Sequence, residues 1–121
     1  MPQTSNSASS AASQPEKYPP NDGAFGGWHE ETLQPGTVVD RYGELSKTSR
    51  YASPFGTPSD ARSLLPGTNE NKVDIFMVSK PIKVDASVIA PWGSSHGGGI
   101  QYRFQLPIKE LMNQGFLIKI P

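Results

Sequence analysis

Two arginines in the first half of the chain have the chemistry to bind phosphate groups. Arg41 follows the strand-like run at residues 37–40, and Arg62 lies where a helix is expected to start. A guanidinium can donate two parallel N–H bonds to one phosphate, so a pair of arginines suits a pyrophosphate. Tyr51 and Phe55, in a proline-containing loop between them, could stack on a planar ring. The set indicates a nucleotide ligand, although a single arginine is more often a solvated surface residue and a single aromatic residue a core anchor.

A second group with possible chemistry is the glycine run before the strand-like segment at residues 100–106. Gly97, Gly98 and Gly99 would let the backbone come close to a ligand and expose its N–H groups. Gln101 is the first polar position of that segment, and its neutral amide can orient a water molecule or a hydroxyl without titrating. From spacing alone, the simpler interpretation is a flexible turn with Gln101 facing water.

The composition excludes several other kinds of site. The chain has no cysteine, which removes a disulfide framework, a thiolate metal site and a cysteine nucleophile, and its two histidines leave little for structural zinc. The dinucleotide fingerprint, the phosphate-binding P-loop and the nucleophile elbow are missing from the sequence. Lys plus Arg and Asp plus Glu balance at 11 each, so we expect no nucleic-acid partner. No apolar run is long enough for membrane insertion.

The chain divides into a short linker and one domain. Residues 1–17 are small and polar, with no large apolar side chain after Met1, so we expect a disordered Ser/Ala-rich linker. The linker lacks the basic start and the apolar stretch of a signal peptide. It fits the cut end of a longer modular protein and, equally, a fragment with an ordinary flexible terminus. Residues 18–121 hold the expected folded domain, which is large enough for one modest core.

The expected elements of this domain are short strands joined by turns. Strands are expected at residues 37–42, 73–78, 82–88, 100–106 and 116–120, and short helices at 57–65 and 107–115. The main signal is alternation of apolar and polar residues, which is typical of half-buried strands. Twelve glycines and twelve prolines among 121 residues disfavour a helical bundle. The sequence therefore predicts the α+β class, with a curved, mostly antiparallel sheet of about five or six strands and about two short helices.

The order of several short motifs resembles that of the tuberculosis necrotizing toxin (TNT) domain family. The motifs cover nearly everything from Tyr18 onward at close to the family spacing, so the set is far more specific than any one of its members. They are the segments at residues 18–23, 33–43, 51–54, 56–58, 61–64, 80–81, 89–92, 97–102 and 115–117.

The resemblance implies an NAD(P)+ glycohydrolase, which hydrolyses the nicotinamide–ribose bond of NAD+ or NADP+ and requires no metal or other cofactor. The functional positions of the family fall on Arg41, Tyr51, Arg62 and Gln101. Together with the residues discussed above, we expect catalytic roles for Gln101, Arg62 and Asp74, and substrate binding by Arg41, Tyr42, Tyr51, Phe55, Gly98 and Gly99. Asp74 stands where some members have a histidine, so either it takes over that role or the role is dispensable. His96 stands where proline is usual, and we expect it to be an exposed loop residue.

The resemblance also implies partners and a place of action. Members are C-terminal toxin domains of secreted bacterial proteins and fungal surface enzymes, so the implied protein is a secreted or delivered effector that depletes the dinucleotide in the cytoplasm of a target cell. The implied partners are a cognate immunity protein that occludes the active site and a parent toxin or secretion machinery reached through the linker. Two alternatives stay open: an ADP-ribosyltransferase that modifies a protein, and a catalytically degenerate nucleotide-binding or interaction module.

Overall fold

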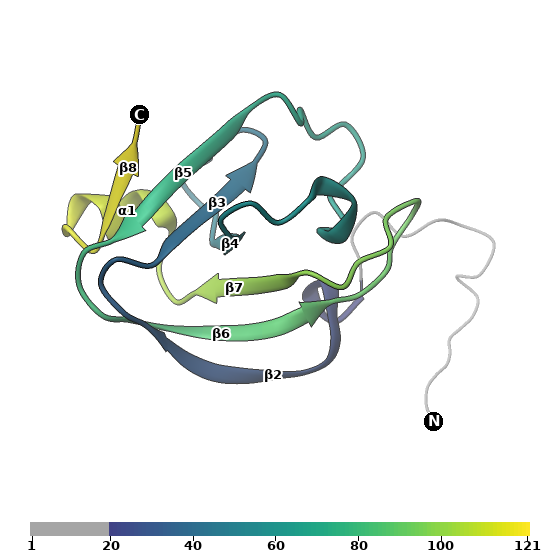
Figure 1. Ribbon diagram of the computed structural model, residues 1–121, viewed down its shortest axis with the longest axis horizontal. Coiled ribbons are helices and arrows are strands. Elements are labelled where there is room, and N and C mark those ends of the chain that lie inside the picture. Colours follow the sequence, from purple (N-terminus) through teal and green to yellow (C-terminus); the bar gives the residue numbers. More distant parts are fainter. Residues whose placement is uncertain (1–19) are drawn as a thin grey trace.

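The computed structural model describes residues 20–121, so the linker expected at residues 1–17 lies outside the described residues (Figure 1). Within residues 20–121, seven strands form one antiparallel sheet in the order β2-β6-β7-β4-β3-β5-β8. The strands are β2 (Ala24–Leu33), β3 (Val38–Tyr42), β4 (Tyr51–Pro54), β5 (Val73–Val78), β6 (Ile82–Ile89), β7 (Ile100–Phe104) and β8 (Leu117–Ile120). The helical elements are α1 (Ile108–Asn113) and the 3-10 turns η2 (Pro20–Gly23) and η3 (Ser59–Ala61). In Figure 1, β3 and β5 run at an angle to β6 and β7, so the sheet is curved.

The predicted antiparallel sheet is confirmed, but the predicted numbers of strands and helices are wrong. The part of the chain that the structure describes forms seven strands, and β2 and β4 are the two that were not predicted. β2 is buried only at its two ends and so lacks apolar alternation, and β4 has only four residues. The helix expected from Thr57 is reduced to the η3 turn. Ser63, shortly after this turn, has a left-handed backbone (φ 51°), which a continuing helix does not tolerate.

The hydrophobic core lies between one face of the sheet and α1. Pro107 precedes the helix and Gly115 follows it with φ 80°, which limits α1 to six residues. Two of those residues, Ile108 and Leu111, are buried. The core cluster consists of Leu33, Val39, Ala52, Phe76, Val78, Ile82, Val84, Phe104, Ile108, Leu111 and Leu117.

The opposite face of the sheet carries polar side chains at its centre. On β7, Phe104 belongs to the core, while Gln101 and Arg103 lie an odd number of positions away and therefore point to the other side. The register pairs Gln101 with Ser87 and Arg103 with Asp85 across β6. Four polar side chains thus share one face, and the candidate site is built on it.

The glycine run packs against the segment that contains η3. The amides of Gly97 and Gly99 donate hydrogen bonds to the carbonyl oxygens of Asp60 and Ala61, at 3.2 and 3.1 Å. The fit is close, because a β-carbon on Gly99 would lie 2.8 Å from Thr57 Cγ2 and 2.9 Å from the Ala61 carbonyl oxygen. Glycine is needed here because two backbone segments touch.

We expect Gly99→Ala to lower the free energy of unfolding by about 1–3 kcal/mol, because the added methyl group forces the two segments apart. Gly27→Ala is the matched control, since a β-carbon on Gly27 meets no atom within 4 Å and its φ is not positive. Chemical denaturation of both variants measures the difference. Equal midpoints for the two variants would show that the contact does not matter for stability.

Candidate functional site

A cavity opens on the polar face of the sheet. It consists of two adjoining hollows of about 100 and 390 Å³. Both are lined by Arg41, Tyr51, Arg62, Leu64, Ile89 and Gln101, and Tyr42 lines the smaller one. The structure therefore brings together five of the predicted site residues. Phe55, Asp74, Gly98 and Gly99 are not among the residues that line these hollows.

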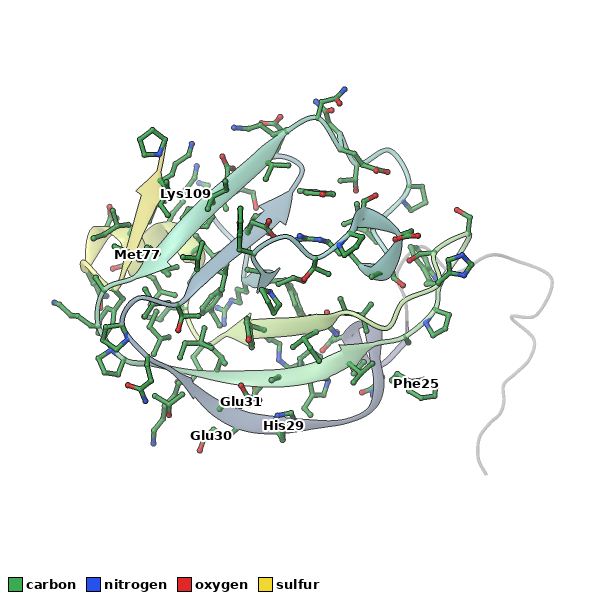
Figure 2. The ribbon with its side chains drawn as sticks, in the orientation of Figure 1. Phe25, His29, Glu30, Glu31, Met77 and Lys109 are labelled. Atoms are coloured by element: carbon green, nitrogen blue, oxygen red, sulfur yellow. The ribbon has the colours of Figure 1, made fainter. Side chains whose placement is uncertain are left out.

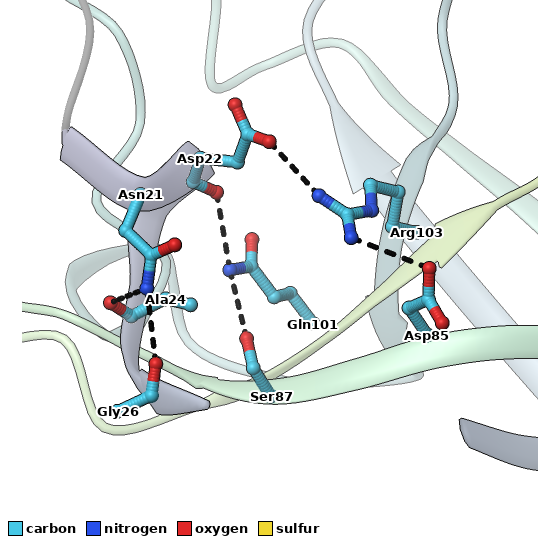
Figure 3. Close-up of polar contacts among 8 residues, drawn as sticks. All are labelled: Asn21, Asp22, Ala24, Gly26, Asp85, Ser87, Gln101 and Arg103. Atoms are coloured by element: carbon cyan, nitrogen blue, oxygen red, sulfur yellow. Dashed lines mark hydrogen bonds and ion pairs between the residues drawn. The ribbon is translucent and has the colours of Figure 1, made fainter. Parts of the chain in front are cut away.

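Gln101 lies at the floor of the cavity and is only 9% exposed, so the interpretation that it faces water is wrong. Its Nε2 donates to Ser87 Oγ at 3.1 Å and, more weakly, to the Asp22 carbonyl oxygen at 3.4 Å (Figure 3). These two bonds use both amide hydrogens. Within residues 20–121, Oε1 has no hydrogen-bond partner. Gln101 therefore presents a hydrogen-bond acceptor to the cavity.

The η2 turn holds the second of these acceptors in place. Asn21 and Asp22 both have left-handed backbone (φ 55° and 51°), and Asn21 Nδ2 donates to the Gly26 carbonyl oxygen at 3.0 Å. The Asp22 carboxylate pairs with Arg103 at 2.9 Å (Figure 3). The Arg103 guanidinium also lies 3.9 Å from the centre of the Trp28 ring. The turn is thus tied to the same face of the sheet that carries Gln101.

Sequence reasoning missed Ser87 and Arg103 as parts of this site. Their contribution depends on the register between β6 and β7, which places Ser87 opposite Gln101. A one-residue shift would have turned the serine to the core face. The usable signal was the place of Ser87 among the alternating polar positions of residues 82–88, considered together with Gln101 on the next strand.

Arg62 is mainly a structural residue in this geometry. Its Nη2 donates to Asp40 Oδ1 at 2.5 Å and to the Thr57 carbonyl oxygen at 2.6 Å. Nε donates to the same Thr57 oxygen at 2.9 Å and Nη1 to the Asp40 carbonyl oxygen at 3.2 Å. The ring centre of Tyr42 lies 4.4 Å from the guanidinium carbon. Four of the five N–H groups are used, so one remains for a ligand, and the expected two-bond grip on a phosphate is not available.

Arg41 has more of its donors free. Its Nη1 donates to the Tyr51 carbonyl oxygen at 3.2 Å, and its buried Nε has no partner within the described part of the chain. Burial lowers the pKa of Arg41 and the charge of Asp74 raises it, but an arginine pKa starts so high that the group stays charged. Burial and the nearby Asp22 raise the pKa of Tyr51, although Arg103 opposes them, so its phenol is neutral near pH 7.

Asp74 lies outside the cavity, on the face of β5 that also carries the buried Phe76. It is 3% exposed, and its Oδ1 lies 3.1 Å from Lys119 Nζ and 3.2 Å from Lys72 Nζ. Its cross-strand neighbour on β3 is Arg41. Burial alone would raise the pKa of Asp74, but hydrogen bonds from the two lysines outweigh burial, and the pKa lies below its ordinary value. Asp74 can therefore influence the site through its charge, which acts on Arg41.

The remaining predicted residues lie at the margin of the site. Phe55 is 59% exposed. The amides of Gly98 and Gly99 donate to the carbonyl oxygens of Ile89 and Ala61, at 2.8 and 3.1 Å, so the expectation that the glycine run exposes its N–H groups is wrong. His96 is exposed, as expected.

Two features of the described residues concern metal ions and membranes. In residues 20–121, no group of three or more His, Cys, Asp or Glu side chains is arranged to hold a metal ion. None of the helices in the same residues has the length and apolarity that crossing a membrane requires.

We expect Arg62→Ala to lower the free energy of unfolding by about 3–5 kcal/mol, because it leaves the Asp40 carboxylate buried without its partner. Arg50→Ala is the control, since Arg50 is exposed and, among the described residues, its side chain donates only to the Gln105 carbonyl oxygen. Thermal and urea unfolding of both variants give the comparison. An Arg62→Ala protein as stable as the wild type would mean that the ion pair does not hold the segment around η3 against β3.

The fold should become less stable in acid partly through Asp74. Because its pKa is lower in the folded protein, ionised Asp74 stabilises the fold above the ordinary value of 3.8, and this contribution is lost as the pH falls through the folded pKa. Lys119→Met should raise the pKa of Asp74, which an NMR titration measures. The stabilisation by ionised Asp74 should then be lost at a higher pH than in the wild-type protein. Lys109→Met, on α1 (Figure 2), should leave the pKa unchanged, and an equal shift in both variants would contradict the assignment.

Several solved structures share this fold. The tuberculosis necrotizing toxin complexed with its immunity factor matches with a TM-score of 0.65 and 21% identity, over 84% of this chain and 60% of that one. Rhs1-CT, in complex with its cognate immunity protein, matches with a TM-score of 0.56 and 15% identity, over 81% of this chain and 80% of that one. Tse6, in complex with Tsi6, matches with a TM-score of 0.53 and 18% identity, over 78% of this chain and 72% of that one. This chain thus spans 60% of the length of the necrotizing toxin chain.

Among curated proteins, none matches the sequence. The family model described as Tuberculosis necrotizing toxin matches residues 32–120, which hold β3 to β8, α1 and every predicted site residue. This match covers well over half of the chain, and the chain therefore belongs to the tuberculosis necrotizing toxin (TNT) family.

Proposed function

We propose that this domain is an NAD(P)+ glycohydrolase, which releases nicotinamide and leaves ADP-ribose or its phosphate. The observation that carries the proposal is the free Oε1 of the buried Gln101, held in a cavity with Arg41 and Tyr51. Membership of the TNT family supports the same reaction.

The chemistry needs few catalytic groups. Nicotinamide leaves the positively charged pyridinium as a neutral molecule, so no general acid has to protonate it. The site must instead stabilise an oxocarbenium-like ribose and hold a water molecule on the opposite face. A fixed amide oxygen can accept a hydrogen bond from that water or from a ribose hydroxyl. Gln101 has this atom free because Ser87 and the Asp22 carbonyl hold its nitrogen.

The neighbouring side chains would align the substrate. Arg41, with a charged and incompletely bonded guanidinium, would bind the pyrophosphate, and Tyr51 would pack against the nicotinamide. Arg62 would form the wall of the site and offer one donor. Asp74 would act on the reaction through the charge of Arg41, its cross-strand neighbour. Phe55, Gly98 and Gly99 would contact a dinucleotide only where it extends beyond the cavity.

The biological setting follows as part of the same proposal. The necrotizing toxin and Rhs1-CT were each solved with an immunity factor or a cognate immunity protein. We propose that this domain is a toxic effector that acts in the cytoplasm of a target cell, and that a cognate immunity protein covers the cavity. The segment at residues 1–17 would connect it to a parent toxin or to secretion machinery.

Incubation of the purified domain with NAD+ and NADP+, followed by quantification of free nicotinamide, tests the activity. Gln101→Ala should lower the rate at least about 100-fold, because it removes a fixed hydrogen bond to the reacting centre, with little change in the melting temperature. Gln105→Ala, an exposed glutamine on the same segment, should keep full activity. No nicotinamide release by folded wild-type protein would refute the proposal, and a mass increase on proteins of a treated lysate would favour ADP-ribosyl transfer.

A further inference from the structure

A separate hollow of about 490 Å³ adjoins the cavity. One wall comes from the segment around η3, with Asp60, Leu64 and Glu70, and the other from the turn at residues 92–95. Leu64 lines this hollow as well as both parts of the cavity around Gln101, so the two sites are neighbours. We call this separate hollow the Trp92 groove.

The two walls of the groove are tied to each other. Trp92 and Ser95 exchange backbone hydrogen bonds at 3.3 and 3.0 Å, which close the turn. The Ser95 hydroxyl donates to the Asp60 carbonyl oxygen at 2.5 Å and accepts from the Ser63 amide at 2.9 Å. These bonds cross from one wall to the other, so the groove is formed before any ligand binds.

The groove combines an aromatic surface with free carboxylates. Trp92 is half-buried in its wall, while Asp60 and Glu70 are exposed. Within the described residues, neither carboxylate takes part in a hydrogen bond or an ion pair, since Asp60 uses only its carbonyl oxygen. A tryptophan offers a stacking surface for a nucleobase, and a carboxylate accepts hydrogen bonds from ribose hydroxyls.

We infer that the Trp92 groove binds the adenosine half of the dinucleotide while its nicotinamide riboside half lies at Gln101. This inference rests on the proposed function. A dinucleotide consists of two nucleosides joined by a pyrophosphate, so it needs two neighbouring hollows. The cavity around Gln101 and the groove supply them, and they meet at Leu64.

The charge of the groove sets a preference between the two dinucleotides. Asp60 and Glu70 are its charged lining residues in the described part of the chain, and neither a lysine nor an arginine accompanies them there. A 2′-hydroxyl can donate to a carboxylate, whereas a 2′-phosphate is repelled by it. The groove therefore selects NAD+ over NADP+.

Fluorescence titration with AMP tests the groove without relying on turnover. The chain contains two tryptophans, Trp28 and Trp92, so their signals can be separated. AMP should quench the emission of the wild-type and Trp28→Phe proteins but not that of Trp92→Phe. Quenching that persists in Trp92→Phe, or no quenching of Trp28→Phe at millimolar AMP, would overturn the inference.

The same titration tests the role of the carboxylates. Adenosine 2′,5′-bisphosphate should bind the wild-type protein at least about tenfold more weakly than AMP, because two negative charges face its 2′-phosphate. The Asp60→Asn/Glu70→Gln double variant should reduce that difference to about threefold or less, whereas Asp85→Asn, which lies outside the groove, should not. Equal binding of the two nucleotides by the wild-type protein would contradict the preference.

The two proposals can fail separately. Nicotinamide release without AMP binding at Trp92 would leave the proposed activity standing and remove the adenosine site. Binding of AMP at Trp92 without nicotinamide release would keep the adenosine site and remove the hydrolase.

Discussion

The buried ion pair between Asp40 and Arg62 is the interaction on which the site depends. Both side chains are about 5% exposed or less, and a pair so deeply buried is favourable only when its remaining donors and acceptors are also bonded. Here they are, because Arg62 also donates to the carbonyl oxygens of Thr57 and Asp40, and Asp40 Oδ2 accepts from the Gly56 amide. The pair therefore fixes the segment around η3 onto β3. That segment in turn accepts hydrogen bonds from the glycine run before β7 and from the turn that carries Trp92.

A consequence of this arrangement is that the two arginines differ in function. Arg62 resembles a ligand-binding residue in the sequence, yet its guanidinium is almost fully bonded within the protein. Arg41 follows Asp40, the last residue of β3 that pairs with β4. In residues 20–121 its guanidinium makes one hydrogen bond, from Nη1 to the Tyr51 carbonyl oxygen, so Nη2 retains donors for a ligand. Gln101 shows the opposite arrangement to Arg41, since the donors of its amide are bonded and its acceptor is left free.

The sequence predicts this fold well where strands alternate and poorly where they do not. In β5 the buried residues alternate with more exposed ones, and β6 and β7 alternate apolar with polar side chains along most of their length, which their spacing shows. β2 is exposed at most of its positions, so its sequence has no alternation of apolar and polar residues from which a strand could be predicted. Of the site, local motifs identify Arg41, Tyr51 and Gln101, which line the cavity. The structural role of Arg62 and the position of Asp74 outside the cavity depend on strand register and on long-range packing. No local sequence pattern encodes either of these.

The bond between Gln101 and the Asp22 carbonyl joins residues 79 positions apart in the sequence. Such a contact forms only after most of the chain between them has folded, because closing so long a loop is entropically unfavourable until the intervening strands hold its ends together. The orientation of the Gln101 amide is therefore a late product of folding. A chain that is still partly unfolded carries all the residues of the site but does not yet present its acceptor.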